Sequence, residues 1–408
     1  MKCRFCNTEL SHLFVSLGSS PFSNVYLRKE QLCNKENFYP LDVFVCERCF
    51  LVQLQQFESP DNIFSDYAYF SSYSDTWLKH SEEYVDKMAK LFGINKSSQV
   101  IEIASNDGYL LQYFVKKGVP VLGVEPARNV AKVARQKGIP TESTFFGVET
   151  AKRLLAEGKS ADLLLGNNVL AHVPDLNDFV EGLKILLKPD GIITMEFPHL
   201  VRLVEGNQFD TIYHEHFSYF SFITVTKIFE AHGLSIFDVE ELPTHGGSLR
   251  IYAKHRDNKK KKISSRVSEL KKEEVDAGYA CLDLYLDFKQ KVKAAKRDIL
   301  DFLIKAKREK KVVVGYGAPA KGNTLLNYCG VRNDFIDYTV DRSPHKQGHY
   351  LPGTHIFIDK PERIRKTKPD YVIILPWNIK EEVMEQMSFI RKWGGKFVTL
   401  IPGVVIKK

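Results

Sequence analysis

The stretch at residues 99–126 constrains the fold of this chain more than any other. Residues 100–104 form a short apolar run, the polar residues 105–108 (Ser-Asn-Asp-Gly) interrupt it, and apolar side chains then continue at helical spacing. A second apolar run, residues 120–124, ends at Glu125. This order of strand, tight turn, helix and strand predicts the opening of a doubly wound α/β domain.

Ligands of doubly wound sheets bind beyond the carboxyl ends of the strands, where residues 105–108 and Glu125 are both expected. A carboxylate at the end of the second strand suits a ribose diol, because it can accept hydrogen bonds from both hydroxyl groups. The first turn lacks the GxGxxG pattern of dinucleotide-binding proteins. It is more similar to the S-adenosylmethionine (SAM) turn of class I methyltransferases.

The length of 408 residues indicates two or three domains with sizeable cores, and we place them at residues 1–70, 71–257 and 258–408. Hydrophobic residues make up 44% of the chain and charged residues 26%, as in ordinary globular proteins. No apolar run approaches the roughly 18 residues of a membrane span, and the N-terminal segment lacks the apolar centre of a signal peptide. We therefore expect a cytoplasmic protein with no membrane partner.

Four of the seven cysteines form two CxxC pairs, Cys3 with Cys6 and Cys46 with Cys49. In a cytosolic chain, such pairs more often bind zinc in a four-cysteine site than form disulfides. The metal would replace a core that about 70 residues could barely supply. Because four thiolates fill a tetrahedron, we predict a structural zinc ion (Zn²⁺) with no part in catalysis. Redox-active or unliganded thiols are the alternatives.

Strands and helices continue to alternate after residue 126. Further strands are expected at residues 161–168, 191–197, 234–242 and 248–255. This count fits the seven-stranded sheet of methyltransferases, whose last strands form an antiparallel pair. Asn167, Asn168 and His172 follow the fourth strand and would lie at the catalytic edge of such a sheet. A functional role and a buried structural role are both open for His172.

The densest group of chemically active side chains follows the fifth strand, between Glu196 and Tyr219. The residues Tyr213, His214, Glu215 and His216 are consecutive, so they cannot form the i, i+4 pair of a zinc-binding HExxH helix. In an extended stretch, alternate residues share a side, so Tyr213 could align with Glu215, or His214 with His216. A histidine oriented by a carboxylate makes a suitable base at neutral pH. A mononuclear metal site and a structural turn are the alternatives.

Two further segments have both a structural and a ligand-binding interpretation. Residues 64–77 interleave tyrosines and serines, which suits either a linker that packs on the next domain or a loop that faces a substrate. Residues 244–248 join the last two strands, where glycines either permit close approach of a ligand or serve only the turn. The candidates for substrate contact are Tyr67, Tyr69 and Ser72 in the first segment and His245 in the second.

The α/β pattern restarts in the last third of the chain. An amphipathic helical connection at residues 263–303, interrupted near Gly278, leads into it. Lys321 and Asn323 enter a helix whose N-terminal amides, together with the lysine, form an anion site for a phosphate or substrate. Arg342 lies in a polar loop that follows a strand. The strands expected in this smaller Rossmann-like domain are 312–315, 335–340, 371–375 and 397–401.

Seven motifs occur in order along nearly the whole chain: the paired CxxC units, EIASNDG, NNVLAHV, EFPHL, EGNQFDTIYHEHFSYFS, THGGS and GYGAPAKGNTLLNY. They resemble the sugar-nucleotide C-methyltransferases that make branched-chain deoxysugars, and the YHEH and AxAKG blocks are specific to that family. The resemblance implies an N-terminal zinc domain, a central SAM domain and a C-terminal Rossmann-like domain. It also implies methylation of a ring carbon next to the keto group of a nucleotide-linked 4-keto sugar.

The resemblance implies roles for individual residues. His216 corresponds to the base that removes the alpha proton, with Glu215 and Tyr213 assisting, and His172 and Tyr67 match positions near the sugar. The expected SAM contacts are Glu102, Ala104, Ser105, Asn106, Asp107, Gly108, Glu125, Pro126, Asn167 and Asn168. The expected sugar-nucleotide contacts are Tyr69, Ser72, His199, His245, Lys321, Asn323 and Arg342. Ala104 departs from the glycine frequent in the family, and we expect its small methyl group to be tolerated.

We therefore predict a SAM-dependent C-methyltransferase that forms an enolate from a nucleotide-linked 4-keto-deoxysugar and methylates it, with C3 as the favoured position. We expect a monomer that binds no nucleic acid, since the net charge of +8 comes largely from a Lys-rich region that we interpret as solvated. A nicotinamide-dependent sugar-nucleotide oxidoreductase is disfavoured by the incomplete glycine fingerprint. A zinc-containing nucleic-acid methylase is disfavoured because no basic groove or base-flipping motif is evident.

Overall fold

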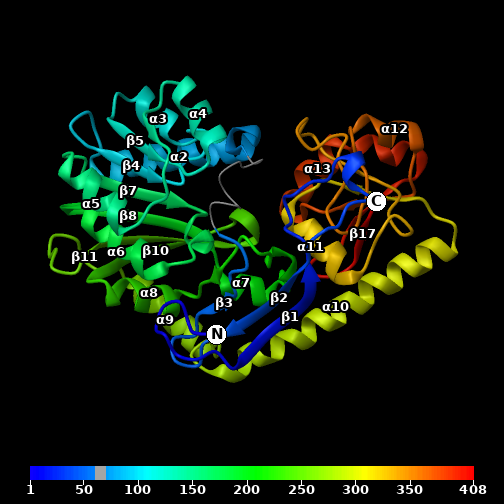
Figure 1. Cartoon of the computed structure of the whole chain (residues 1–408), viewed down its shortest axis with the longest axis horizontal. Helices are drawn as coiled ribbons and strands as arrows, with labels where there is room; N and C mark the ends of the chain where they lie inside the picture. Colours follow the sequence, from blue (N-terminus) through cyan, green and yellow to red (C-terminus); the bar gives the residue numbers. More distant parts are fainter. Residues whose placement is uncertain (60–69) are drawn as a thin grey trace.

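The computed structural model describes residues 1–59 and 70–408, and the strands of these residues pair into three sheets (Figure 1). Tyr67 and Tyr69, both predicted at the substrate, lie outside the described residues. Among the described residues, no helix has both the length and the apolar character that a membrane crossing requires. Figure 1 shows the largest sheet on one side, the C-terminal sheet on the other, and the N-terminal strands beneath and between them.

The central sheet contains the strands β4 (Val100–Ile103), β5 (Val121–Val124), β6 (Thr141–Glu142), β7 (Ala161–Asn167), β8 (Leu187–Pro198), β10 (Leu234–Leu242) and β11 (Ser248–His255). Their spatial order is β10-β11-β8-β7-β4-β5-β6. Neighbouring strands are parallel, except that β11 runs antiparallel to both β10 and β8. This order confirms the predicted class I methyltransferase sheet with its antiparallel last pair.

The direction of winding reverses between β4 and β7, because β5 and β6 lie on one side of β4 while β7 and β8 lie on the other. All residues of β4 and β5 are buried, as in strands that helices cover on both faces. The turn at residues 105–108 and the pair Asn167–Asn168 both follow strands at this reversal. Such switch points are where open α/β sheets bind their ligands.

The helices on the central sheet begin at side-chain caps. Ser74, Asp175 and Ser221 each accept the backbone N–H of the residue three positions further on, which satisfies one free donor of the first helical turn. The helices are α2 (Asp75–Phe92), α3 (Leu111–Lys116), α4 (Arg128–Gln136), α5 (Val148–Ala156), α6 (Leu176–Leu186), α7 (Leu200–Glu205) and α8 (Phe222–Ala231). Short 3-10 turns span Lys29–Gln31, Ser71–Tyr73, Leu170–His172, Phe209–Thr211, Thr244–Gly246, Trp377–Ile379 and Ser388–Trp393.

The N-terminal sheet is antiparallel and takes its fourth strand from the middle of the chain. Its strands, in spatial order, are β1 (His12–Ser20), β2 (Tyr39–Val45), β3 (Val52–Leu54) and β9 (Ser218–Tyr219). β9 begins two residues after His216, the predicted base. The pairing of Val52 with Tyr219 therefore ties the loop of that histidine to the cysteine-bearing part of the chain.

A long helical connection joins the central and C-terminal sheets. α9 (Ser265–Asp276) ends before Gly278, whose φ of +93° suits glycine, and α10 (Leu282–Arg308) then runs for 27 residues. The predicted interruption near Gly278 is thus confirmed. Phe288 of α10 stacks on Phe14 of β1 with ring centroids 4.6 Å apart, so the connection also lies along the N-terminal sheet (Figure 1).

The C-terminal sheet contains β12 (Val313–Tyr316), β13 (Thr339–Val340), β14 (Ile358–Asp359), β15 (Tyr371–Ile374), β16 (Lys396–Thr399) and β17 (Val405–Lys407), with α11 (Ala320–Cys329), α12 (Glu362–Thr367) and α13 (Lys380–Gln386). Their order is β14-β13-β12-β15-β16-β17, and only β17 runs antiparallel. The strand predicted at 335–340 is wrong over its first part. Phe335 lies in a turn there, because its N–H donates to the Arg332 carbonyl at 3.0 Å.

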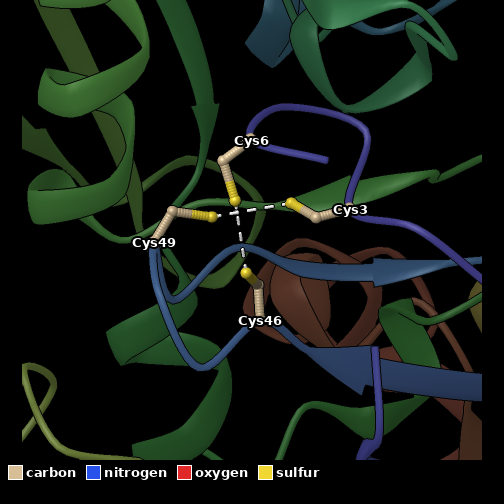
Figure 2. Close-up of side chains that lie close together, drawn as sticks. All are labelled: Cys3, Cys6, Cys46 and Cys49. Carbon is tan, nitrogen blue, oxygen red and sulfur yellow. Dashed lines mark hydrogen bonds between the residues drawn. The ribbon is translucent and has the colours of Figure 1, made fainter. Parts of the chain in front are cut away.

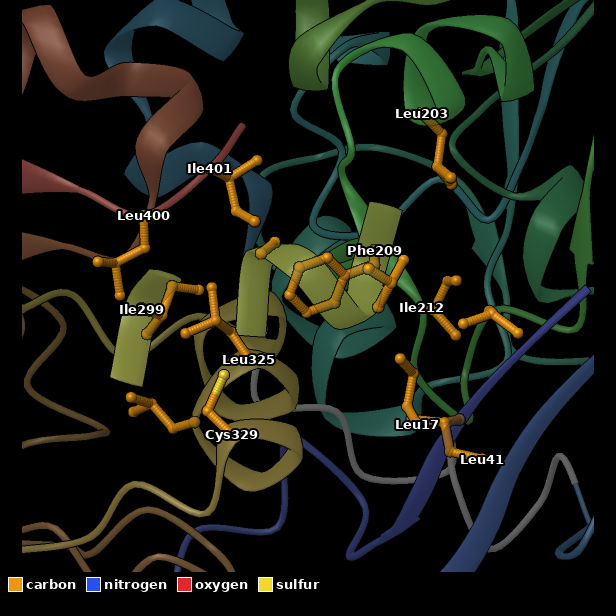
Figure 3. Packing of buried hydrophobic residues seen from close by; sticks show 14 of the residues in the cluster. Leu17, Leu41, Leu203, Phe209, Ile212, Ile299, Leu325, Cys329, Leu400 and Ile401 are labelled. Carbon is orange, nitrogen blue, oxygen red and sulfur yellow. The ribbon is translucent and has the colours of Figure 1, made fainter. Parts of the chain in front are cut away.

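A single apolar cluster joins the N-terminal sheet, the segment between α7 and β9, α10 and the C-terminal sheet (Figure 3). Burying each of its large side chains contributes roughly 1.5–3 kcal/mol, so the three parts of the chain stabilise one another. The members labelled in Figure 3 are Leu17, Leu41, Leu203, Phe209, Ile212, Ile299, Leu325, Cys329, Leu400 and Ile401.

Candidate active site and metal centre

The turn after β4 has an unusual backbone. Ala104, Asn106 and Gly108 have φ angles of +55°, +49° and +76°. A Cβ atom on Gly108 would lie 2.2 Å from the Cδ1 atom of Ile139, so a larger residue there would have to displace the buried Ile139 side chain. The left-handed conformation costs an alanine roughly 1–2 kcal/mol. The cost of an alanine at residue 104 therefore comes from its backbone conformation and not from the size of its methyl group.

Glu125, the residue after β5, is oriented by backbone amides. Its carboxylate oxygens accept the N–H of Asn106 at 2.9 Å and the N–H of Ala127, just beyond Pro126, at 2.8 Å. Burial raises the pKa of Glu125 to about 6, although these two hydrogen bonds oppose the shift. Each oxygen retains a second lone pair, so the fixed carboxylate can still accept from two neighbouring hydroxyl groups.

Several buried polar atoms around this turn have no hydrogen-bond partner among the described residues. Burial also raises the pKa of the Glu102 carboxyl well above its usual value. Buried polar groups normally have partners, and SAM carries amino, carboxylate and hydroxyl groups that can supply them. The residues therefore fit SAM. The unpartnered atoms are Oγ of Ser105, Oδ1 of Asp107 and Oδ1 of Asn168, whereas Glu102 and Asn167 lie against the buried Tyr109 hydroxyl.

His172 and His216 lie beside each other with ring centroids 4.7 Å apart. Nδ1 of His216 is 2.9 Å from the Thr211 carbonyl oxygen, and Nδ1 of His172 is 2.7 Å from the Glu215 carbonyl oxygen. Because a carbonyl oxygen can only accept, both Nδ1 atoms carry the proton and both Nε2 atoms are acceptors. The Tyr213 hydroxyl accordingly donates to Nε2 of His216 at 2.8 Å.

Burial keeps both rings unprotonated. It lowers the pKa of His172 to about 4 and that of His216 well below its usual value. The neighbouring His172, His245 and Lys321 lower the pKa of His216 further, whereas the Thr211 carbonyl opposes the shift. Two neutral imidazoles therefore lie edge to face at neutral pH, and Nε2 of His216 accepts from Tyr213.

Residues 213–216 form a turn and not an extended stretch. The His216 N–H donates to the Tyr213 carbonyl at 2.9 Å, which brings residues three positions apart together. Tyr213 therefore contacts His216, and the alignment that alternation predicts does not form. The Glu215 carboxylate faces the N-terminal part of the chain, where Nδ2 of Asn24 donates to both of its oxygens at 2.8 and 2.9 Å.

His214 faces away from the histidine pair. Its Nε2 is 3.2 Å from the Pro40 carbonyl oxygen, and its ring lies among the rings of Phe22, Tyr39 and Phe57. These contacts indicate that His214 packs its loop against the N-terminal part of the chain. Among the described residues, no group of three metal-ligating side chains includes the histidines of this turn.

His245 lies in the turn between β10 and β11 with a φ of +54°, which is rare for a histidine. Nδ2 of Asn168 donates to its Nε2 at 3.0 Å, and the ring of Trp77 meets it edge-on at 5.2 Å. Burial, helped by the charge of Lys321, lowers the pKa of His245 to about 4. The structure thus brings His245 together with Asn168 at the switch point.

The four predicted metal ligands converge on one point (Figure 2). All four sulfur atoms of Cys3, Cys6, Cys46 and Cys49 lie within 4.8 Å of one another. The Cys3–Cys49 and Cys6–Cys46 sulfur distances are 3.6 and 3.5 Å, far longer than the roughly 2.05 Å of a disulfide. Four sulfurs at Zn–S distances of about 2.3 Å lie this close together, so the residues fit a tetrahedral zinc ion.

Family comparisons match the three parts of the chain in the same order. Residues 3–64 match a putative zinc-binding domain, residues 77–239 a methyltransferase domain, and residues 243–402 a C-methyltransferase C-terminal domain. The chain is also 36% identical to the C-methyltransferase NovU of Streptomyces niveus over 401 residues, which cover 98% of this chain and 95% of that protein. The chain belongs to the C-methyltransferase family.

Two further similarities cover smaller shares of this SAM-dependent C-methyltransferase. The ubiquinone biosynthesis O-methyltransferase of Bartonella bacilliformis is 30% identical over 99 residues, which are 23% of this chain and 39% of that protein. Among solved structures, magnesium protoporphyrin IX methyltransferase of Synechocystis PCC 6803 with bound SAH is 15% identical and has a TM-score of 0.36. That match covers 43% of this chain and 82% of the other.

A buried charged network beside His245 joins Glu196, the first residue of the dense segment, to residues that the sequence did not single out. Glu196, fully buried at the end of β8, accepts hydrogen bonds from His80 at 2.9 Å, Arg250 at 2.7 Å and Thr244 at 2.9 Å. Although burial opposes it, the hydrogen bond from His80 and the charge of Arg250 lower the pKa of Glu196 to about 2. The network holds the turn that carries His245.

Lys321 of α11 reaches toward the same cluster from the C-terminal part of this C-methyltransferase. Its Nζ donates to Oδ1 of Asn378 at 2.8 Å and lies 4.6 Å from the centroid of the Trp377 ring. The Trp377 indole N–H donates to Oδ2 of Asp210 at 2.7 Å. Asp210 is fully buried and was not singled out from the sequence, although it lies in the dense segment at residues 196–219.

The described contacts of four predicted sugar-nucleotide residues do not involve the histidine pair. His199 pairs with Glu274 at 2.7 Å, and Asn323 is buried with its Nδ2 3.4 Å from the Ser23 carbonyl oxygen. The other two residues are nearer the surface. Ser72 accepts from Lys137 at 2.9 Å, and Arg342 lies 3.9 Å from Glu382.

Proposed function

We propose that this C-methyltransferase methylates the ring carbon next to the keto group of a nucleotide-linked 4-keto-deoxysugar, with C3 as the favoured position. The observation that carries the proposal is the pair of neutral histidines, His172 and His216, in a SAM-dependent C-methyltransferase. A saturated carbon becomes a nucleophile only after it loses a proton, and a neighbouring ketone makes that proton removable by a histidine. The seven sequence motifs support a sugar nucleotide as the ketone.

His216 is the proposed base. Its Nδ1–H is held by the Thr211 carbonyl, so Nε2 takes the alpha proton and the C–H electron pair becomes the enolate. The Tyr213 hydroxyl, which donates to this Nε2, can turn to donate to the enolate oxygen once Nε2 carries the proton. Bound SAM supplies an electrophilic methyl group. The enolate carbon forms the new C–C bond as the bond between the methyl group and the sulfonium sulfur breaks, with its electron pair left on sulfur. The ketone is restored, and His216 releases its proton to solvent.

The surrounding residues are proposed to position these groups. His172 donates to the Glu215 carbonyl and Asn24 holds the Glu215 carboxylate, so the turn that carries the base is fixed on two sides. We also propose that SAM lies on residues 105–108, with Glu125 at its ribose and Asn168 near its methionine end.

The C-terminal part is the proposed sugar-nucleotide-binding domain, with the boundaries near residues 70 and 257 that the sequence suggests. Lys321 lies at the start of α11, and its charge acts on both His216 and His245. A cation in this place suits a diphosphate or an enolate oxygen. Tyr67, Tyr69 and Arg342 are proposed as further contacts to the sugar nucleotide.

Hydrogen exchange in heavy water tests the proposed base. With a 4-keto sugar nucleotide and no SAM, the wild type should exchange the alpha hydrogen. His216→Asn should lower that rate by about 10²–10⁴-fold and leave the SAM dissociation constant unchanged, because the base does not hold the cofactor. Tyr213→Phe should lower it less, having lost one hydrogen bond to the developing charge.

His12→Asn is the matched control, since His12 is partly exposed and pairs with Glu47 at the surface. It should exchange and methylate like the wild type. Full exchange by the His216 variant would place the base elsewhere, with His172 next to test. Exchange that persists while methylation is lost would instead assign His216 a positioning role.

A further inference from the structure

Arg4 connects the metal centre to the two loops that carry the histidine pair. It is the second residue of the first CxxC pair, between Cys3 and Cys6. One terminal nitrogen of its guanidinium donates to the Pro174 carbonyl and the other to the Leu54 carbonyl, both at 2.6 Å.

Both carbonyls belong to segments that hold the histidines. Pro174 follows His172 by two residues. The Leu54 N–H donates to the Phe217 carbonyl at 3.1 Å, and the Phe217 N–H donates to the Ala171 carbonyl at 2.7 Å. A backbone ladder thus runs from β3 across the residue after His216 to the residue before His172.

The guanidinium also covers the side chain in the middle of that ladder. The central carbon of the Arg4 guanidinium lies 5.5 Å from the centroid of the Phe217 ring, within the range of a cation–π contact. Arg4 therefore touches the flank of His216 through Phe217 and the flank of His172 through Pro174. A single side chain constrains both loops.

The backbone of Arg4 is fixed to the metal ligands. Its N–H donates to Oε1 of Gln53 at 2.9 Å, and Nε2 of the same Gln53 lies 3.2 Å from the Cys3 sulfur. Nδ2 of Asn177, at the start of α6, donates to the Phe5 carbonyl at 3.0 Å. Metal ligand, glutamine and arginine form one connected unit, as outer-sphere residues commonly do at metal sites.

We propose that Arg4 is a positioning residue that transmits the geometry of the metal centre to the His172 and His216 loops. The zinc ion then performs no chemistry, but it fixes the first CxxC turn and so the direction of the guanidinium. Displacements of about 1 Å at a catalytic group can lower a rate about a hundredfold. The role of the two histidines rests on the proposed function, whereas the contacts of Arg4 do not.

Arg4→Met, compared with Arg48→Met, tests the proposal in the zinc-loaded protein. Arg48 lies inside the second CxxC pair but is exposed, so the same chemical change is made near the same metal without the interior contacts. Both variants should retain one zinc ion per chain and the wild-type SAM dissociation constant. In Arg4→Met alone, the Phe217 amide should exchange with solvent roughly tenfold faster, because its loop opens more often.

The same variant should methylate with kcat about ten- to a hundredfold lower and with little change in KM. Arg4→Lys should recover part of the rate and of the protection, because an ammonium keeps the charge but lacks the planar fork for two carbonyls. Wild-type protein stripped of zinc should show the same faster exchange of the Phe217 amide. In the zinc-free protein, Arg4→Met should not increase that exchange rate further.

Unchanged exchange at Phe217 and unchanged kcat in zinc-loaded Arg4→Met would overturn the proposal. Should Arg4→Met not fold, Arg4→Lys decides it in the same way. Wild-type protein that fails to methylate any sugar nucleotide would overturn the proposed substrate. The Phe217 exchange and the zinc arm would still decide the role of Arg4.

Discussion

Ala104 illustrates what a single residue contributes to the SAM turn. The sequence directed attention to its small methyl group, whereas the structure places the cost in its φ of +55°. Asparagine and glycine at residues 106 and 108 are typical of a left-handed turn, because both adopt this conformation readily. Alanine at residue 104 does not indicate such a turn.

Ala104→Gly should therefore stabilise the protein. Glycine removes a conformational cost of roughly 1–2 kcal/mol and adds unfolded-state entropy worth roughly 0.5–1 kcal/mol, so a net gain of up to about 1.5 kcal/mol is expected in urea unfolding. Ala151→Gly in α5 is the control and should destabilise by about 1–2 kcal/mol, because it loses both helix propensity and a buried methyl group. Equal losses in both variants would contradict the backbone explanation.

Individual roles were predictable where the motif is local and not where partners are distant. Tyr213 and His216 belong to one short motif, and they do contact each other, although through a turn. His80 was missed because its partner Glu196 lies 116 residues away, and Asp210 because Trp377 lies 167 residues away. The tautomers of His172 and His216 could not be predicted either, since each depends on the backbone carbonyl that the ring contacts.

At the scale of elements, the end of β5 and the turn after β4 act as one unit. Glu125 already accepts two backbone N–H groups, so removing its side chain would disturb the turn as well as the cofactor. Glu125→Gln isolates the effect better than alanine does. Glutamine keeps the shape of the Glu125 side chain, but its NH₂ group replaces one of the two oxygens that accept the backbone N–H groups of Asn106 and Ala127.

Glu125→Gln should weaken SAM binding about tenfold or more, since a hydrogen bond to a charged group contributes roughly 1.5–3 kcal/mol. Calorimetric titration with SAM measures it. Glu142→Gln is the matched control, because Glu142 ends the next strand, β6, but pairs with Arg153 and Lys159 near the surface. A SAM affinity that falls equally in both variants, or in neither, would show that the ribose does not lie on Glu125.

The order of elements could be predicted for most of the central and C-terminal sheets, whereas the strands of the N-terminal sheet and the short strands were not predicted. Buried strands such as β4 and β7 can be predicted from their runs of apolar side chains alone. By contrast, β9, β13 and β14 have two residues each, and β17 has three, so they contain no measurable period. They exist because a neighbouring strand offers hydrogen bonds, which is a tertiary property.

At the scale of the whole molecule, the three parts share a core that no pattern in the sequence reveals. Periodicity shows that a face is apolar but not which other face covers it. Phe14 of β1 thus meets Phe288 of α10, and Phe209 meets Tyr328 of α11. The histidine pair adjoins this shared core, because Phe217, the residue after His216, is one of its members.

We expect the buried contact between Asp210 and Trp377 to make the free energy of unfolding dependent on pH. Burial raises the pKa of Asp210 from 3.8 to about 6, although the charge of Lys321 and the Trp377 N–H oppose the shift. An acid with a raised folded-state pKa stabilises the fold fully below its unfolded pKa. That contribution is lost as the pH rises through about 6, and it amounts to roughly 3 kcal/mol at most.

Asp210→Asn cannot ionise, yet it keeps a carbonyl oxygen for the Trp377 N–H. Its free energy of unfolding relative to wild type should therefore rise by about 2 kcal/mol between pH 4.5 and pH 7.5 in urea titrations. Glu273→Gln, exposed on α9, should show no such rise. If Asp210→Asn instead loses stability relative to wild type as the pH rises, the attraction between Lys321 and ionised Asp210 outweighs burial, and these two residues form an ion pair at neutral pH.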